Sequence, residues 1–157
     1  MRTFRLPAQV DLVICEFNAL NHVPRKSDLR RVARAVARAL RGGGHFFFDV
    51  HTPAAFAEPG NWIGETPNYL VFSRRGYSAK KKKGWLEFTM FTTRRNGMWK
   101  RSWERIEQVC WTSSGIRQAL TEAGFIKIRR FDASTLLPRE MATRPHSTDF
   151  YVAQKKK

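Results

Sequence analysis

The sequence predicts an α/β fold in which a parallel strand–helix–strand unit is followed by an antiparallel β insertion. Two apolar stretches at residues 10–17 and 45–51 flank a segment with helical spacing, which is typical of a parallel crossover. After residue 53 the pattern changes to alternating segments separated by turn signals. At 157 residues the chain has room for one domain with a usable core. We expect a single domain, residues 1–157, with a core at 1–53 and 112–157 and an insertion at 54–111.

The first full strand is predicted over residues 10–17, where a near-continuous apolar run indicates burial on both faces. Residues 1–7 are interpreted as the end of an edge strand. A helix is predicted from Ser27, its expected N-cap, to about Arg41, with an apolar stripe at helical spacing. Three glycines at 42–44 are expected to end it, one of them as a left-handed C-cap. They leave a helix and enter a strand, so they do not form a phosphate loop.

The insertion is predicted to begin with an irregular connection at residues 52–67, which is rich in Pro, Gly and Asn. Three antiparallel strands follow, over residues 69–77, 85–94 and 98–111. The Asn96-Gly97 pair favours a two-residue type I′ turn, which would set Arg94 opposite Trp99.

The last elements return to the core. A short helix is predicted over residues 114–123, capped by Thr112 or Ser113 and stopped by Gly124. A final strand pair is predicted at residues 126–131 and 150–153.

The net charge of +16 is extreme for this length and favours attraction to a polyanion such as RNA. The alternative is that the basic residues are solvated, because the clusters at 80–83 and 155–157 fall at a predicted loop tip and at the carboxyl terminus. Cys15 and Cys110 lie in apolar strand patterns, which indicates buried, reduced thiols and a cytoplasmic protein. No stretch approaches the roughly 20 apolar residues of a membrane span.

Several segments together resemble the class I S-adenosylmethionine-dependent methyltransferases. They are residues 10–22 (VDLVICEFNALNH), 39–44 (ALRGGG), 46–53 (FFFDVHTP), 111–116 (WTSSGI) and 120–125 (LTEAGF). The similarity covers essentially the whole chain in the right order. It implies a partial Rossmann-like sheet, to which this chain contributes strands 4, 5, 6 and 7 of the family order 3-2-1-4-5-7-6. The antiparallel insertion resembles the substrate-side sheet of members that act on small molecules.

One departure from the family is large. The glycine-rich turn after the first strand and the acidic residue that binds the cofactor ribose cannot be placed in this chain. We therefore expect a truncated domain that binds S-adenosyl-L-methionine weakly or not at all. The strand at residues 10–17 would then present an unpaired apolar edge, which favours self-association.

Candidate site residues follow from the ends of the two parallel strands, where such sheets bind ligands. The resemblance implies that Glu16, Phe17 and Asn18 face the cofactor. It also implies that Asn21 and His22 face the substrate.

Asp49 and His51 end the second strand at the same crevice. His51 is a candidate general base because its ordinary pKa lies near working pH, and His22 is a second candidate. Structural roles remain equally open, since His22 can bond to backbone and Asp49 can cap the turn at residues 52–53. Trp62 and Arg101 are candidates for substrate binding. No metal site is predicted, because the four histidines (His22, His45, His51, His146) lack ligand spacing.

Two functions are compatible with these observations. The first is methyl transfer to an N, O or C nucleophile of a small molecule, impaired in this chain. The second is a non-catalytic basic module, derived from the same fold, that binds RNA or a protein partner.

Overall fold

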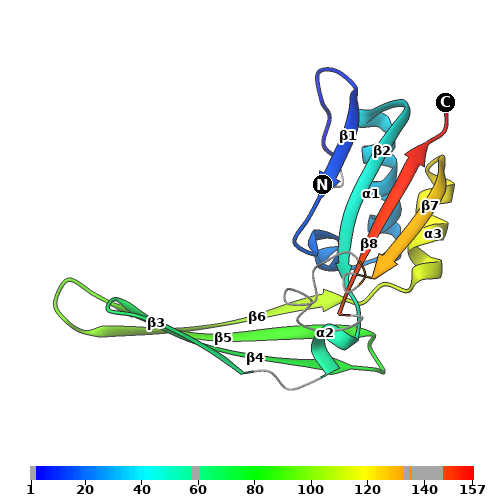
Figure 1. Cartoon of the computed structure of the whole chain (residues 1–157). Coiled ribbons are helices and arrows are strands. Elements are labelled where there is room, and N and C mark those ends of the chain that lie inside the picture. Colours follow the sequence, from blue (N-terminus) through cyan, green and yellow to red (C-terminus); the bar gives the residue numbers. More distant parts are fainter. Residues whose placement is uncertain (1–2, 58–60, 133–134, 136–146) are drawn as a thin grey trace.

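The computed structural model describes residues 3–57, 61–132, 135 and 147–157, which form two four-stranded sheets (Figure 1). The core sheet has the order β1-β2-β8-β7. Its strands are β1 (Val10–Cys15), β2 (Leu40–His51), β7 (Phe125–Asp132) and β8 (Thr148–Lys155). The insertion sheet has the order β3-β4-β5-β6. Its strands are β3 (Trp62–Thr66), β4 (Tyr69–Ser78), β5 (Lys83–Thr93) and β6 (Trp99–Val109).

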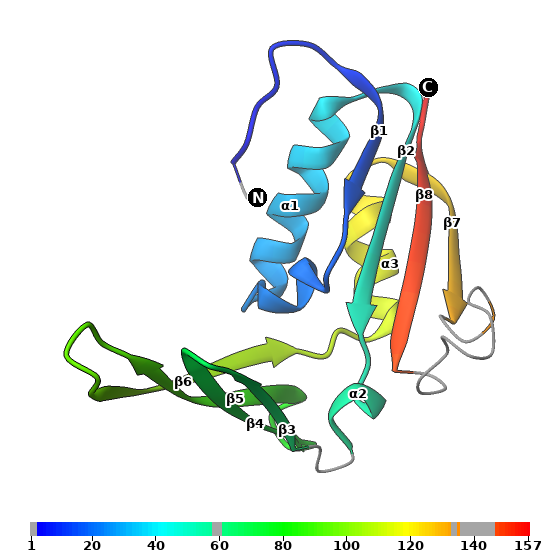
Figure 2. The ribbon, with the colours of Figure 1, turned by 60° about the vertical axis from the view of Figure 1, so that its left-hand side comes forward.

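The order of the core sheet confirms the α/β prediction and the expected series 4-5-7-6. β1 and β2 are parallel, whereas β8 runs antiparallel to both β2 and β7. Helices α1 (Lys26–Ala39) and α3 (Ser113–Glu122) cover one face of this sheet (Figure 2). The insertion sheet extends away from the core as a long arm, reached through the short helix α2 (Ala54–Ala57).

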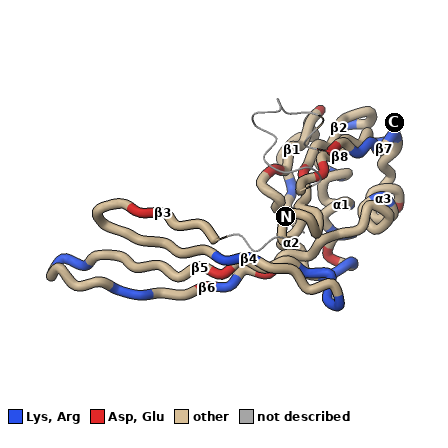
Figure 3. Tube along the Cα trace, turned by 60° about the horizontal axis from the view of Figure 1, so that its bottom comes forward, with Lys and Arg blue, Asp and Glu red and all other residues tan. Residues whose placement is uncertain are grey.

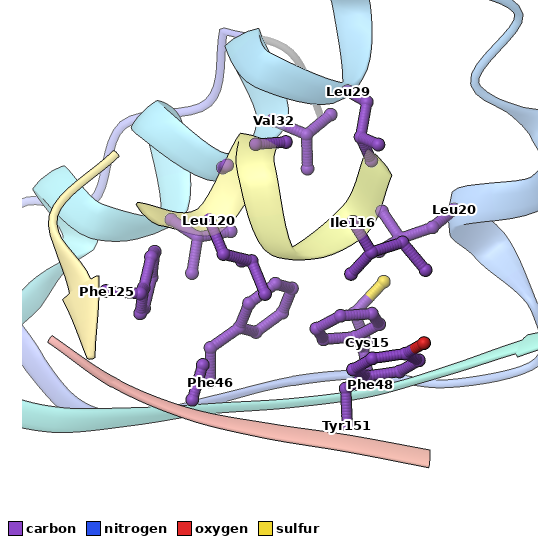
Figure 4. Close-up of a cluster of buried hydrophobic side chains, with 14 of the residues drawn as sticks. Cys15, Leu20, Leu29, Val32, Phe46, Phe48, Ile116, Leu120, Phe125 and Tyr151 are labelled. Atoms are coloured by element: carbon purple, nitrogen blue, oxygen red, sulfur yellow. The ribbon is translucent and has the colours of Figure 1, made fainter. Parts of the chain in front are cut away.

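The hydrophobic core fills the space between the helices and the covered face of the sheet (Figure 4). Phe46 and Phe48 alternate along β2 toward the helices, and both are buried. The Phe48 ring stacks on Tyr151 of β8, with centroids 5.1 Å apart. Opposite them, α1 and α3 contribute buried apolar residues, Val32 and Leu120 among them.

The second face of the core sheet has no helix over it in the described part of the chain. Leu12 is 52% exposed and Ile14 is 55% exposed, so β1 is not buried on both faces as its apolar run predicted. The other strands contribute half-buried rings to this face, and Phe47 stacks on Phe150 with centroids 5.6 Å apart. β1 is also an edge strand, and residues 3–9 form no strand beside it, contrary to expectation.

The ends of α1 differ from their prediction. The N-cap is Arg25 without a side-chain hydrogen bond, not Ser27. The C-cap is Leu40, whose extended backbone leads directly into β2, so the glycines at 42–44 belong to the strand. Gly43 still adopts a φ of 85°, and this left-handed residue lies in the strand rather than at the helix end. By contrast, Thr112 caps α3 as predicted, accepting a hydrogen bond from the Gly115 backbone N–H.

The arm differs from its prediction in one turn and one strand. Between Arg94 and Met98 only Gly97 has a positive φ, and its N–H donates to Arg94 O, so the connection is a longer loop and not a type I′ turn. The longer loop shifts the register by one residue and pairs Trp99 with Thr93. β3 forms within the segment predicted to be irregular. In the part of the chain that the structure describes, no helix is long and apolar enough to cross a membrane.

Candidate functional site

The candidate site lies where β1 and β2 end, beside the inner end of the arm. Because the two strands are parallel, their carboxyl ends share one edge of the core sheet. The chain leaves β1 through two consecutive left-handed residues, Phe17 with φ 60° and Asn18 with φ 56°. Such backbone is uncommon outside glycine and is maintained by its surroundings. Here the Asn18 backbone N–H donates to Asp49 Oδ1 at 3.0 Å, so β2 holds the loop in place.

Asp49 is therefore a structural anchor of this loop. Burial raises the pKa of its carboxyl, and the hydrogen bond from the Asn18 N–H opposes that shift. The predicted role of Asp49 as a cap of the following turn is not what the structure shows.

The three candidate cofactor residues occupy different environments. Phe17 is 88% exposed, and Glu16 is exposed as well. The Asn18 side chain is half-buried, and its Oδ1 atom is buried with no hydrogen-bond partner in the described residues. Their role toward a cofactor stays a prediction.

Asn21 locks three elements together at the site. It lies in the 3-10 helix η1 (Ala19–His22) and is completely buried. Its Nδ2 donates to the backbone oxygens of His51 and Val109, both at 2.9 Å, and its Oδ1 accepts from the His51 N–H at 2.9 Å. The side chain is thus fully committed to backbone groups. This corrects the expectation that Asn21 faces the substrate.

The structure brings His22 and His51 together through a third residue, Gln108 of β6. Gln108 Oε1 lies 3.0 Å from His51 Nδ1, and Gln108 Nε2 lies 3.1 Å from His22 Nε2. We refer to His22, Gln108 and His51 as the histidine bridge. Gln108 is only 5% exposed and His51 is half-buried, whereas His22 is exposed.

The histidine bridge fixes where the imidazole protons lie. An amide oxygen only accepts and an amide nitrogen only donates. With the Gln108 amide oriented in this way, His51 Nδ1 donates to its Oε1, and His22 Nε2 accepts from its Nε2. Burial lowers the pKa of His51, which keeps the ring neutral at pH 7 and leaves its Nε2 with a free lone pair. Phe56 packs edge-on against this ring, with centroids 5.4 Å apart.

Sequence reasoning predicted both histidines and missed Gln108. The one available signal was its position in β6, between Ile106 and Cys110 on the same side of the strand. A polar residue between two apolar ones on an inward side needs a buried partner. No motif marks it.

Trp62 and Arg101 lie elsewhere, on the arm. Both line a hollow of about 460 Å³ on the insertion sheet. Arg101 is seven residues from Gln108 along β6, or about 23 Å at about 3.3 Å per residue. The structure thus separates this pair from the histidine bridge, and its predicted role in substrate binding stays untested.

Thiol and metal chemistry receive no support in the described residues. Cys15 and Cys110 are free and buried, and burial raises the pKa of each to about 11, so both remain protonated. No three His, Cys, Asp or Glu side chains of the described residues could together hold a metal ion, and His146 lies outside those residues.

Comparison with known proteins extends this picture. No protein-family model matches the sequence, and no curated protein matches it. Solved structures do match. An S-adenosylmethionine-dependent methyltransferase from Clostridium acetobutylicum is 16% identical, with a TM-score of 0.76 over 99% of this chain and 62% of its own.

Two further matches are methyltransferases of sugars. A sugar N-methyltransferase from a Streptoalloteichus species is 18% identical, with a TM-score of 0.73 over 99% of this chain and 60% of its own. An amino pentose methyltransferase from Micromonospora echinaspora, bound to its cofactor, is 19% identical, with a TM-score of 0.69 over 99% of this chain and 62% of its own. The chain therefore spans about three fifths of their length, and over that span it has the fold of the S-adenosylmethionine-dependent methyltransferases.

Proposed function

We propose that the histidine bridge serves the acceptor side of methyl transfer from S-adenosyl-L-methionine to a nitrogen, oxygen or carbon nucleophile of a small molecule. The observation that carries the proposal is the position of His51 at the carboxyl end of β2, where its Nδ1 lies 3.0 Å from Gln108 Oε1. The solved structures that share this fold are methyltransferases, two of them acting on sugars, which supports a small-molecule acceptor.

The residues that follow β1 fit part of such a cofactor. The orphaned Asn18 Oδ1 can accept a hydrogen bond from an amino group, and the exposed Phe17 ring can lie against a purine. The carboxylate of Glu16 would place a negative charge beside a cationic group of the cofactor. When bound, the cofactor supplies a methyl group on a positively charged sulfur. Three residues of one loop are a small contact surface, and we expect weak binding by this chain alone.

The remaining chemistry belongs to the chain itself. An amine or hydroxyl must lose a proton as it is methylated, and Nε2 of His51 is the nitrogen free to accept that proton. Gln108 holds the ring in the required tautomer, while Asn21 fixes the backbone of His51 on both sides. Orientation of the reacting groups provides most of the rate in such transfers.

The test is an NMR titration of the isotope-labelled chain with S-adenosylhomocysteine, followed by an amino sugar. We expect shifts confined to residues 16–22, 49–51 and 108, at millimolar concentrations of the nucleoside. His51→Gln should remove the response to the amino sugar and retain the response to the nucleoside. Shifts that map to other surfaces contradict the proposed site, and a micromolar dissociation constant by calorimetry contradicts weak cofactor binding.

A basic, non-catalytic binding module is the second candidate function. Arg30, Arg34 and Arg38 lie on α1, and Arg41 follows at the start of β2. Arg30 pairs with Glu122 and Arg41 with Asp11, each at 2.7 Å, whereas Arg34 and Arg38 are exposed. This candidate requires RNA binding that weakens steeply with salt, and no methyl transfer to any acceptor.

A further inference from the structure

A second concave site lies at the inner end of the arm. A hollow of about 410 Å³ forms where the β4–β5 turn, the end of β6 and the first turns of α1 and α3 meet. Four lysines line it: Lys26, Lys81, Lys82 and Lys83. Figure 3 shows basic residues gathered where this end of the arm meets the core. The lysine cluster at residues 80–83 lies at the β4–β5 turn, as expected, and Lys80, Lys81 and Lys82 are exposed.

The turn that carries these lysines is tied to the wall of the hollow. Lys82 adopts a left-handed backbone with φ 51°, which is uncommon for a non-glycine residue. Its carbonyl oxygen accepts the Cys110 N–H at 3.0 Å, and its own N–H donates to Ala79 O at 3.3 Å. The backbone is thus fixed on both sides of the turn, and the three consecutive lysines are held at the rim.

The charge of the hollow is poorly compensated. No acidic residue is among the described residues that line it. One carboxylate lies close by, because Lys83 Nζ contacts Glu107 Oε2 at 2.7 Å. Lys83, and more weakly Lys81 and Arg105, lower the pKa of Glu107, so this carboxylate is ionised at neutral pH. One carboxylate against four ammonium groups leaves a concave site that favours an anion.

The walls indicate what kind of anion fits. Thr112, the N-cap of α3, and Ser114 in its first turn also line the hollow, and their hydroxyl oxygens lie 3.2 Å apart. One hydroxyl donates to the other, which leaves one hydroxyl hydrogen for a ligand beside the lysine ammonium groups. Val109, Cys110 and Trp111 form an apolar side. The volume suits a small molecule, whereas a nucleic acid strand needs an extended groove. We propose that this hollow binds the phosphate or diphosphate group of a small molecule, with the lysines on its oxygens and the Trp111 side against its apolar part.

The hollow is separate from the histidine bridge. Gln108 and Val109 are neighbours on β6, and successive side chains of a strand point to opposite faces. No residue of the histidine bridge is among the described residues that line the hollow. A test of phosphate binding in this hollow therefore does not depend on whether the chain takes part in methyl transfer.

The experiment is calorimetric titration of the full chain with inorganic pyrophosphate at about 50 and 200 mM salt. Lys81→Gln/Lys82→Gln removes two charges from the hollow, and Lys156→Gln/Lys157→Gln removes two exposed charges elsewhere. Charge-assisted hydrogen bonds predict that the first double variant binds pyrophosphate about tenfold more weakly. The control variant should change the affinity by less than about twofold.

Three outcomes overturn the phosphate site. One is an absence of pyrophosphate binding at low salt, and another is equal weakening by both double variants. The third is a preference for a single-stranded oligonucleotide whose affinity grows with its length, which would assign the charge to nucleic acid binding. Circular dichroism of both variants must match the wild-type chain, which separates lost binding from lost folding.

Discussion

The replacement Gln108→Leu tests the histidine bridge directly. Leucine has a similar volume and no polar atoms, so it removes both hydrogen bonds without opening a cavity. The variant loses the hydrogen bond between Gln108 and His51, at 3.0 Å, and the one between Gln108 and His22, at 3.1 Å. The two histidines respond differently, because His22 is exposed and His51 is half-buried.

The expected loss of stability follows from those two environments. Water replaces the hydrogen bond to exposed His22, so that bond contributes little. The bond to His51 contributes about 1 kcal/mol, and its half-buried Nδ1–H left without a partner adds about 1 kcal/mol. We expect the free energy of unfolding to fall by about 2 kcal/mol, which lowers Tm by about 4–8 °C in a chain of this length. Urea unfolding followed by tryptophan fluorescence measures the change.

The protonation of His51 provides a second measurement. In the wild-type chain ¹⁵N NMR should show the Nδ1-protonated tautomer of His51, and Gln108→Leu should give a mixture of tautomers. The Gln108 hydrogen bond favours the charged ring, so its loss lowers the pKa of His51 further, while Gln108→Glu raises it.

The pH dependence follows from the same shift. The pKa of His51 lies below its unfolded value of about 6.5, so the unfolded chain binds the proton first. The contribution of His51 to stability is thus full above about pH 6.5 and is lost as the pH falls through its folded pKa. An unchanged tautomer and pKa of His51 in Gln108→Leu would refute the histidine bridge.

Three further predictions concern other residues. Asp49→Asn keeps an acceptor for the loop N–H and removes a buried charge, so stability at pH 7 should hold or rise, whereas Asp49→Ala should cost about 1–2 kcal/mol in thermal unfolding. Asn21→Leu leaves three buried backbone groups without partners and should cost about 3–5 kcal/mol in urea unfolding; a cost under about 1 kcal/mol would contradict its role. Leu12→Lys/Ile14→Lys should reduce self-association in light scattering, and a wild-type chain that stays monomeric at every concentration would disprove association through this face.

The sequence predicted what depends on local pattern. The parallel unit from β1 to β2 carries helical and strand spacing in its own residues, and the cap at Thr112 is a short-range hydrogen bond. The turn at Gly97 was only partly predictable. The sequence does not show whether one or two of its residues adopt a left-handed backbone, and the two cases pair β5 with β6 in different registers. The exposed side of β1 was missed, because an apolar run does not reveal what covers it.

The site was predictable in its histidines and not in their connection. His22 and His51 follow the two strand ends, where a sheet of this type binds ligands. Gln108 reaches them from 57 and 86 residues away in the chain, and no spacing rule spans such distances. Asn21 looked like a ligand-facing amide because only the tertiary structure reveals its three backbone partners.

One mechanical consequence follows from the way β6 ends. The same strand runs the length of the arm and is fastened at its inner end to η1 and β2, through Asn21 at Val109 and through Gln108. A shift of β6 at this end would therefore move Gln108 relative to the imidazoles of both His22 and His51.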